Sequence, residues 1–283
     1  MKNKNIYPWL VVAMLWGVAL LNYMDRQMLS TMKSAMQVDI IELQSATNFG
    51  RLMAVFLWIY GLMSPISGII ADRMNRKWLI VGSLFVWSVV TSLMGEAETF
   101  QQIYWLRALM GVSEALYIPA GLSLIADYHS GKSRSLAVGI HMTGLYTGQA
   151  IGGFGATVAA AFSWNTTFHW FGIIGIVYAL LLMIFLKDKK SSFAETKTES
   201  SASPQEKKSL FKGLGMLFSN LSFWIILLYF AAPSLPGWAT KNWLPTLFAD
   251  SLNIPMSQAG PIATITIAVS SFIGVIAGGI LSD

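Results

Sequence analysis

Long, nearly uncharged apolar segments recur along this 283-residue chain, and they restrict its fold more than any other feature. About 20 apolar residues in an α-helix are enough to cross the roughly 30 Å hydrocarbon core of a bilayer. Charged residues make up only 12% of the chain, against roughly 25% in an average soluble domain. The sequence therefore predicts an all-α polytopic membrane protein. Eight spans are expected, at residues 8–29, 49–71, 78–95, 103–126, 136–162, 168–186, 219–238 and 258–281.

Lysines and arginines gather in the connections that would face one side of the membrane. Fourteen of them lie in the N-terminus, in the loops after the second and fourth spans, and in the polar segment 187–212, whereas the opposite connections hold Lys33 and Lys241. The positive-inside rule therefore predicts a cytoplasmic N-terminus in an inner or plasma membrane. The net charge of +5 then reflects topology, and we expect no nucleic-acid partner.

Residue types that serve catalysis are not arranged for it in this sequence. There is no cysteine, and His129, His141 and His169 lie in a loop, a span and an outer segment without metal-ligand spacing. No nucleophile–base arrangement or phosphate-binding loop motif is apparent either. We therefore expect no enzyme, no metal site and no cofactor.

Two acids and two arginines fall inside the first and fourth predicted spans, where a charge costs about 2.5 to 3.5 kcal/mol on insertion scales. Asp25 and Arg26 lie toward the outer end of the first span, while Arg107 and Glu114 share one face of the fourth. The two spans run in opposite directions, so Asp25 and Arg107 are expected at similar depth. With both acids ionised the four charges sum to zero, and protonating one leaves +1, which suits a single carboxylate. A static salt bridge between helices is the alternative interpretation.

Two spans end with the same spacing of a glycine and an aspartate. The second span ends in Gly68, Asp72, Arg73 and, shortly after, Arg76, and residues 279–283 repeat the Gly-x-x-x-Asp spacing. Repeats with a shared offset are typical of transporter halves, and charge contacts at span ends can differ between conformations. We predict that Gly68, Asp72, Arg73 and Arg76 take part in conformational gating.

The fifth predicted span carries Gly144, Gly148 and Gly152 at intervals of four residues. Small residues at this spacing form a flat stripe, which favours close helix packing over ligand contact. Gln149 and His141 in the same span are candidates for lining a cavity, or for satisfying the backbone of a neighbouring helix.

Several of these motifs resemble a known family. The Asp72 segment is similar to the signature loop of the major facilitator superfamily, with Asn75 where a glycine is usual, and Arg107-x-x-x-Gly111 resembles its fourth-helix pattern. That superfamily has twelve spans in two six-helix halves. The resemblance implies a complete N-terminal six-helix bundle at 1–186, a cytoplasmic linker at 187–212, and the first two helices of a truncated C-terminal half at 213–283.

Within the superfamily, the chain resembles two branches. Asp25-Arg26, the stretch from Arg107 to Ala115, and Trp243-Leu-Pro-Thr-Leu247 are similar to the anion:cation symporters, which import organic anions such as sugar acids. Residues 21–26 and 111–115 also resemble spinster-type lipid carriers. A non-transporting membrane sensor is the remaining alternative, since buried ion pairs can also serve a switch.

The symporter resemblance implies a role for each of the buried residues. It implies a secondary active transporter that imports a small organic anion by proton symport through alternating access, as a monomer in the lipid bilayer, with sodium not excluded as the coupling ion. Asp25 and Arg107 would form a proton-sensitive pair, and Glu114 would carry a proton. Arg26 would face the substrate carboxylate, with Arg107, Tyr23 and Gln149 as further substrate-binding candidates.

The charge asymmetry predicts that Ser201, in the linker, lies in the cytoplasm. A Ser201→Cys variant should stay unlabelled when a membrane-impermeant thiol reagent is added to intact cells, and should react after the membrane is permeabilised. Lys33→Cys, on the opposite side, serves as the control that reacts from outside. Labelling of Ser201→Cys in intact cells would overturn the orientation.

Overall fold

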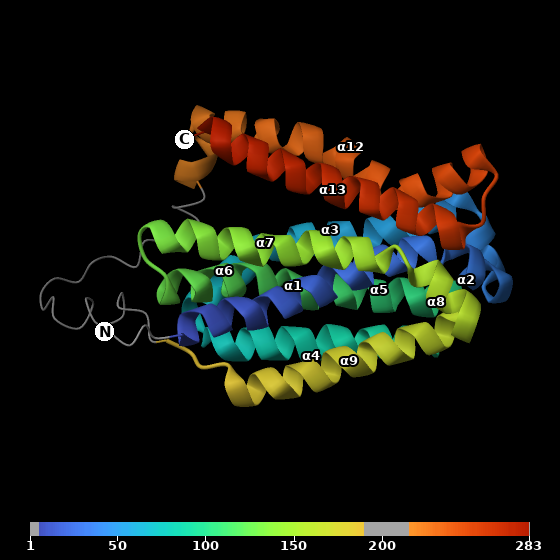
Figure 1. The fold of residues 1–283 in the computed structure, drawn as a ribbon, viewed down its shortest axis with the longest axis horizontal. Helices are drawn as coiled ribbons and strands as arrows, with labels where there is room; N and C mark the ends of the chain where they lie inside the picture. Colours follow the sequence, from blue (N-terminus) through green and yellow to red (C-terminus); the bar gives the residue numbers. More distant parts are fainter. Residues whose placement is uncertain (1–5, 190–214, 283) are drawn as a thin grey trace, which may run out of the picture. The chain divides into compact units, whose positions relative to one another are not determined.

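The computed structural model describes residues 6–189 and 215–282, and Figure 1 shows that their regular elements are helices. The first group comprises α1 (Tyr7–Thr31), α2 (Lys33–Asp39), the 3-10 helix η1 (Ile41–Gln44), α3 (Ala46–Arg73), α4 (Arg76–Met94), α5 (Phe100–Ala115), α6 (Tyr117–Tyr128), α7 (Lys132–Gly152), α8 (Gly155–Phe162) and α9 (Trp164–Phe185). Beyond the linker follow α12 (Leu221–Leu252) and α13 (Met256–Ser282). The predicted all-α class is confirmed.

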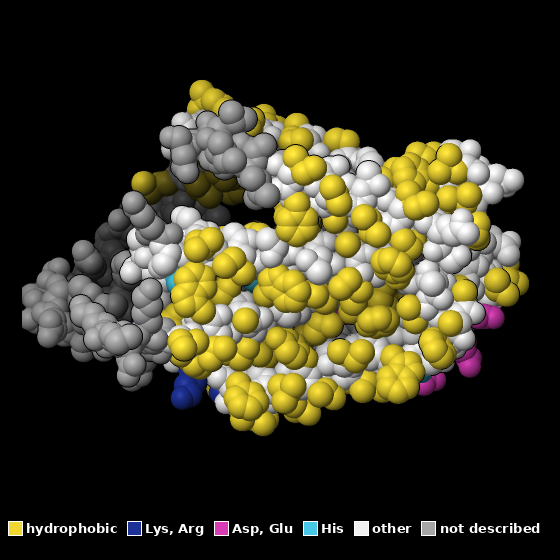
Figure 2. All heavy atoms as spheres, in the orientation of Figure 1, with side chains coloured by type: hydrophobic (Ala, Val, Ile, Leu, Met, Phe, Trp, Pro, Cys, Tyr) yellow, Lys and Arg dark blue, Asp and Glu magenta, His cyan; other side chains and the backbone are white. Residues whose placement is uncertain are grey.

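Seven helical stretches in the described residues are long and apolar enough to cross a membrane. They correspond to all of the predicted spans except the fifth, and are Tyr7–Thr31, Ala46–Ala71, Arg76–Met94, Phe100–Tyr128, Trp164–Phe185, Leu221–Leu252 and Met256–Ile273. Figure 2 shows hydrophobic side chains covering much of the visible lateral surface, with basic groups near one end and acidic groups near the other. Such a surface suits a bilayer, because lipid-facing helices need no polar covering.

The fifth predicted span, 136–162, is interrupted. Helix α7 ends at Gly152, Gly153 and Phe154 form a turn, and α8 begins at Gly155. Glycine is among the weakest helix formers, so the adjacent Gly152 and Gly153 favour a break here. The 21 residues of α7 still extend about 31 Å at 1.5 Å per residue.

Helices α1 and α7 pack with their backbones in close contact, as the glycine stripe predicted. A methyl group added at Gly144 would lie 2.7 Å from the carbonyl oxygen of Trp16, and one at Gly152 would lie 2.6 Å from that of Met24. Gly148 packs against the carbonyl of Leu20 in the same way. The prediction that this stripe serves packing is confirmed.

Helix α9 covers α4 through a similar contact. A methyl group at Gly172 would meet the backbone nitrogen of Ser92 at 2.5 Å, and Gly175 packs against Ser88. Small residues on both helices therefore let α4 and α9 pack closely in the bilayer.

The fourth predicted span consists of two helices, α5 and α6, joined at Leu116. Pro119, in the first turn of α6, has no N–H to donate to the carbonyl four residues earlier, that of Ala115. Beyond the joint, the hydroxyl of Tyr117 donates a 2.8 Å hydrogen bond to the carbonyl oxygen of Leu15. The joint thus lies two residues after Glu114, and the Tyr117 hydrogen bond links α6 to α1.

The chain divides into two compact units, residues 1–189 with 244–283, and residues 190–243. In the first unit, α13 packs on α7 and α8: Thr264 Oγ1 donates to the carbonyl of Ala150 at 3.2 Å, and Thr157 Oγ1 to that of Ser257 at 2.9 Å. Most of the predicted linker lies outside the described residues, so the domain boundaries remain a prediction.

The α1–α7 contact predicts that Gly148→Leu is destabilising, because its side chain would meet the Leu20 backbone. Overpacking of this kind costs about 1 to 3 kcal/mol. Gly139→Leu is the matched control, since Gly139 lies on the same helix with no atom within 4 Å of an added methyl group. Melting temperatures of the two variants in detergent would test this, and equal values would contradict the packing role.

Candidate functional site

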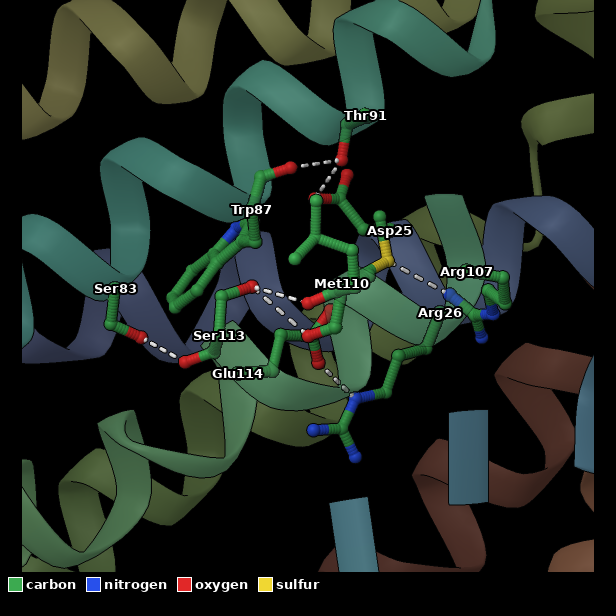
Figure 3. A network of polar contacts seen from close by, with 10 residues as sticks. Asp25, Arg26, Ser83, Trp87, Thr91, Arg107, Met110, Ser113 and Glu114 are labelled. Carbon is green, nitrogen blue, oxygen red and sulfur yellow. Dashed lines mark hydrogen bonds and ion pairs between the residues drawn. The ribbon is translucent and has the colours of Figure 1, made fainter. Parts of the chain in front are cut away.

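An ion pair between α1 and α5 lies at the centre of the candidate site. Arg26 Nε donates to Glu114 Oε2 at 2.7 Å. The Glu114 side chain is fully buried, and the Arg26 side chain is 20% exposed. Figure 3 shows Arg26 reaching from α1 to Glu114, close to Asp25 and Arg107. The structure thus brings together the four ionisable residues that the sequence singled out.

Asp25 is held by α4 rather than by an arginine. Thr91 Oγ1 lies 3.2 Å from Asp25 Oδ2 and 2.9 Å from the carbonyl oxygen of Trp87, and the two contacts share one hydroxyl (Figure 3). Asp25 is 5% exposed, and its Oδ1 has no hydrogen-bond partner among the described residues. One oxygen of this carboxyl group therefore remains without a donor.

Arg107 is 2% exposed and makes no ion pair with any residue that the structure describes. Its Nη1 donates to the sulfur of Met110 at 3.0 Å, and its Nε has no hydrogen-bond partner there. A thioether is a weak acceptor for a guanidinium. The expected ion pair of Asp25 with Arg107 is therefore not formed in this structure, and Arg107 is a buried cation without a paired carboxylate.

Aromatic rings surround the two guanidinium groups. The Arg26 Cζ lies 4.8, 4.7 and 4.8 Å from the ring centres of Tyr23, Phe56 and Tyr60. The Arg107 Cζ lies 4.3 Å from the ring centre of Phe56. These are cation–π distances. Tyr23 was predicted for the site, whereas Phe56 and Tyr60 were missed, although their i, i+4 spacing places both on one face of the second span.

Gly111 explains why α3 can place these rings beside the arginines. A methyl group at Gly111 would lie 2.9 Å from the carbonyl oxygen of Phe56 and 3.3 Å from the nitrogen of Tyr60. The glycine of the Arg107-x-x-x-Gly111 pattern therefore allows α5 and α3 to touch at the level of the site.

Gln149 is 3% exposed on α7, and its Nε2 has no hydrogen-bond partner in the described ranges. His141, the other polar residue predicted from this span, is fully buried, and its ring lies 6.0 Å from that of Tyr117. In the described ranges neither residue forms a hydrogen bond or ion pair with the four ionisable residues, so the substrate role of Gln149 remains a prediction.

Three of the predicted gating residues, Gly68, Asp72 and Arg73, lie at the C-terminal end of α3, and the fourth, Arg76, begins α4. Arg76 forms an ion pair with Asp127 at the end of α6, and its Nη1 lies 3.5 Å from the carbonyl oxygen of Ser123. A methyl group at Gly68 would meet no described atom within 4 Å, so no close helix contact is made there. The side chains of Asp72 and Arg73 lie outside the described residues, and the gating role remains a prediction.

The arrangement favours ion binding over covalent chemistry. No group of three or more His, Cys, Asp and Glu side chains in the described residues could hold a metal ion. Two cations and two potential anions instead face one another in an apolar setting, where Coulomb interactions are much stronger than in water. Such a site can bind an anion and exchange a proton.

Comparison with known proteins gives the family. A sequence model of the Major Facilitator Superfamily matches residues 15–283. The chain belongs to the major facilitator superfamily. The helical fold agrees, because a bacterial homologue of the human lysosomal transporter spinster, in an inward-facing and unoccupied conformation, superposes with a TM-score of 0.79 at 22% identity. That comparison covers 99% of this chain and 63% of the other.

The curated superfamily relatives fall into the two branches that the motifs resemble. The hexuronate transporter of Bacillus subtilis is 28% identical, covering 100% of this chain and 66% of the relative. The probable L-galactonate transporter of Escherichia coli is 24% identical, covering 95% and 60%. Human protein spinster homolog 1 is 28% identical, covering 86% and 46%. This chain thus spans less than two thirds of each of these relatives. The superfamily consists of transporters, so the prediction that the chain is not an enzyme is confirmed.

Proposed function

We propose that this chain supplies the anion-binding and proton-coupling residues of a secondary active transporter that imports a small organic anion together with a proton. The observation that carries the proposal is Arg107, a buried guanidinium without an ion pair in the described chain, beside the Arg26–Glu114 pair. We place the protein in the inner or plasma membrane with its N-terminus in the cytoplasm.

Arg107 is the primary anion contact in this proposal. A buried charge is costly unless it is paired, and the planar guanidinium fork matches a carboxylate in geometry as well as charge. Its Nε lacks a hydrogen-bond partner in the described residues. A substrate carboxylate would complete both the charge and the hydrogen bonding of Arg107.

Glu114 is the proposed proton carrier, and Arg26 responds to it. While Glu114 is ionised, it accepts the hydrogen bond of Arg26 Nε and neutralises that guanidinium. Protonation of Glu114 would remove the countercharge and leave Arg26 available to the substrate. Proton and anion would then each raise the affinity for the other by the same factor, as symport requires.

Asp25 is the second acid in reach of this site. Its contact with Thr91 satisfies one carboxyl oxygen, and the other has no partner among the described residues. Asp25 therefore remains the alternative proton site if Glu114 proves to be structural. Sodium in place of the proton would act on the same carboxylates.

Alternating access completes the proposal. The Arg76–Asp127 ion pair joins the start of α4 to the end of α6, and Arg76 follows the last residue of α3, Arg73, by three positions. We propose that charge contacts of these residues differ between the inward-open and outward-open states, because ion pairs at helix ends can be exchanged without unfolding a helix.

The relatives' names support sugar acids as the substrate class, and this can be tested by uptake. Proteoliposomes containing the complete gene product, with an inward-directed proton gradient, should accumulate labelled glucuronate or galactonate. A labelled lysolipid is assayed in parallel for the spinster-like alternative. Movement of the lysolipid without uptake of either sugar acid would overturn the proposal in favour of the lipid carrier.

Glu114→Gln should separate coupling from binding. Glutamine mimics the protonated acid at almost constant shape, so anion binding and anion counterflow should persist while accumulation driven by a pH gradient is lost. Arg26→Ala should instead weaken binding and reduce counterflow as well, because it removes a partner of the carboxylate. Both variants are compared after their folding is checked. Wild-type accumulation by Glu114→Gln would show that Glu114 is structural and transfer the proton role to Asp25.

A further inference from the structure

One aromatic ring is shared by both arginines of the site. The ring centre of Phe56 lies 4.7 Å from the Arg26 Cζ and 4.3 Å from the Arg107 Cζ. Phe56 is only 1% exposed, so both contacts are made away from water, where cation–π attraction is strongest. No carboxylate side chain of the described residues contacts both guanidinium groups in this way.

Two guanidinium groups held near one another in an apolar site repel each other. Glu114 forms an ion pair with Arg26 and none with Arg107, and the repulsion would grow if Glu114 were protonated. The face of an aromatic ring carries partial negative charge, so Phe56 attracts both cations without needing a counterion. A carboxylate loses its charge when it is protonated, whereas the Phe56 ring does not titrate and attracts the cations in either state of Glu114.

The position of Phe56 is fixed by its backbone. The Phe56 carbonyl oxygen packs against Gly111, where an added methyl group would lie 2.9 Å away, and Gly111 is one helical turn from Arg107 on α5. Tyr23 and Tyr60 complete the surroundings of Arg26, whereas the Arg107 guanidinium makes its cation–π contact with Phe56. Phe56 is therefore the ring that links the two arginines.

We propose that Phe56 is a positioning residue that holds Arg26 and Arg107 together as one anion-binding unit, so that both guanidinium groups stay directed at a single carboxylate when Glu114 is protonated. This inference rests on the proposed anion transport. It adds that anion affinity depends on the electron density of the Phe56 ring, and not only on its volume.

Fluorinated phenylalanine tests this dependence directly, because fluorine withdraws electron density from the ring face at nearly constant shape. Phenylalanine, 4-fluorophenylalanine and 3,4,5-trifluorophenylalanine are introduced at position 56 of the complete gene product, and binding of glucuronate and galactonate is measured in detergent. The dissociation constant should rise stepwise with fluorine number, reaching at least fivefold for the trifluoro ring. Phe56→Leu, which removes the ring, should raise it at least tenfold.

Phe49 provides the matched control. It is also buried on α3, two turns before Phe56, and its ring faces Lys33 at 5.0 Å rather than the two arginines. Trifluorination at Phe49 should change the dissociation constant less than twofold. Phe49→Leu should lower the melting temperature about as much as Phe56→Leu does, but it should not raise the dissociation constant in the same way.

The outcomes separate this inference from the function on which it rests. If the unmodified protein binds neither sugar acid, the proposed function fails, and the role of Phe56 fails with it. If it binds one of them with an affinity that fluorination at Phe56 leaves unchanged, or that fluorination at Phe49 lowers equally, only the role of Phe56 is overturned.

Discussion

The Arg26–Glu114 ion pair is the interaction around which the charges of the candidate site are arranged. A charge in an apolar bundle must be matched by a partner, and this pair matches one cation of α1 with one acid of α5. Asp25 accepts a hydrogen bond from the hydroxyl of Thr91 on α4. Among the described residues, Arg107 donates to the Met110 thioether and lies against the Phe56 ring. Within the described chain, Arg107 is therefore the buried guanidinium without an ion-paired carboxylate, and this is why we propose it as the anion contact.

Close backbone packing makes this charge arrangement possible. Gly111 allows α3 to approach α5, while the glycines of α7 bring that helix against the opposite part of α1. The large rings of Phe56 and Tyr60 fit beside the arginines because small residues elsewhere leave room for the helices to touch. Small and aromatic residues therefore act together in shaping the site.

Much of the fold follows from the sequence, because long apolar runs leave few alternatives to helical spans. The break at Gly153 was missed, since apolar content does not report on helix propensity. Rotation of Arg107 and Glu114 to one face followed from helix geometry alone. The partner of Glu114 could not be predicted in this way, because it depends on how α1 and α5 are rotated about their axes. The side chains of Asp25 and Arg26 are separated by only about 100° of rotation around α1.

The aromatic part of the site was the least predictable. A phenylalanine in an apolar span is usually a lipid-facing or packing residue, and Phe56 carries no sign in the sequence that it contacts two cations. Its position opposite Gly111 becomes meaningful only when α3 and α5 are seen in contact. Motifs centred on charged residues therefore give an incomplete list of such a site.

The direct backbone contact between α1 and α7 also has a mechanical consequence. Side chains between two helices can change rotamer and absorb a displacement, but at Gly144, Gly148 and Gly152 helix α7 places no side chain of its own against the backbone of α1. We therefore expect the two helices to move as one unit, with Asp25 and Arg26 on α1 and the α13 contact at Ala150 on α7. A change of charge at Asp25 or Arg26 that moves α1 would then move α7 and its contact with α13 as well.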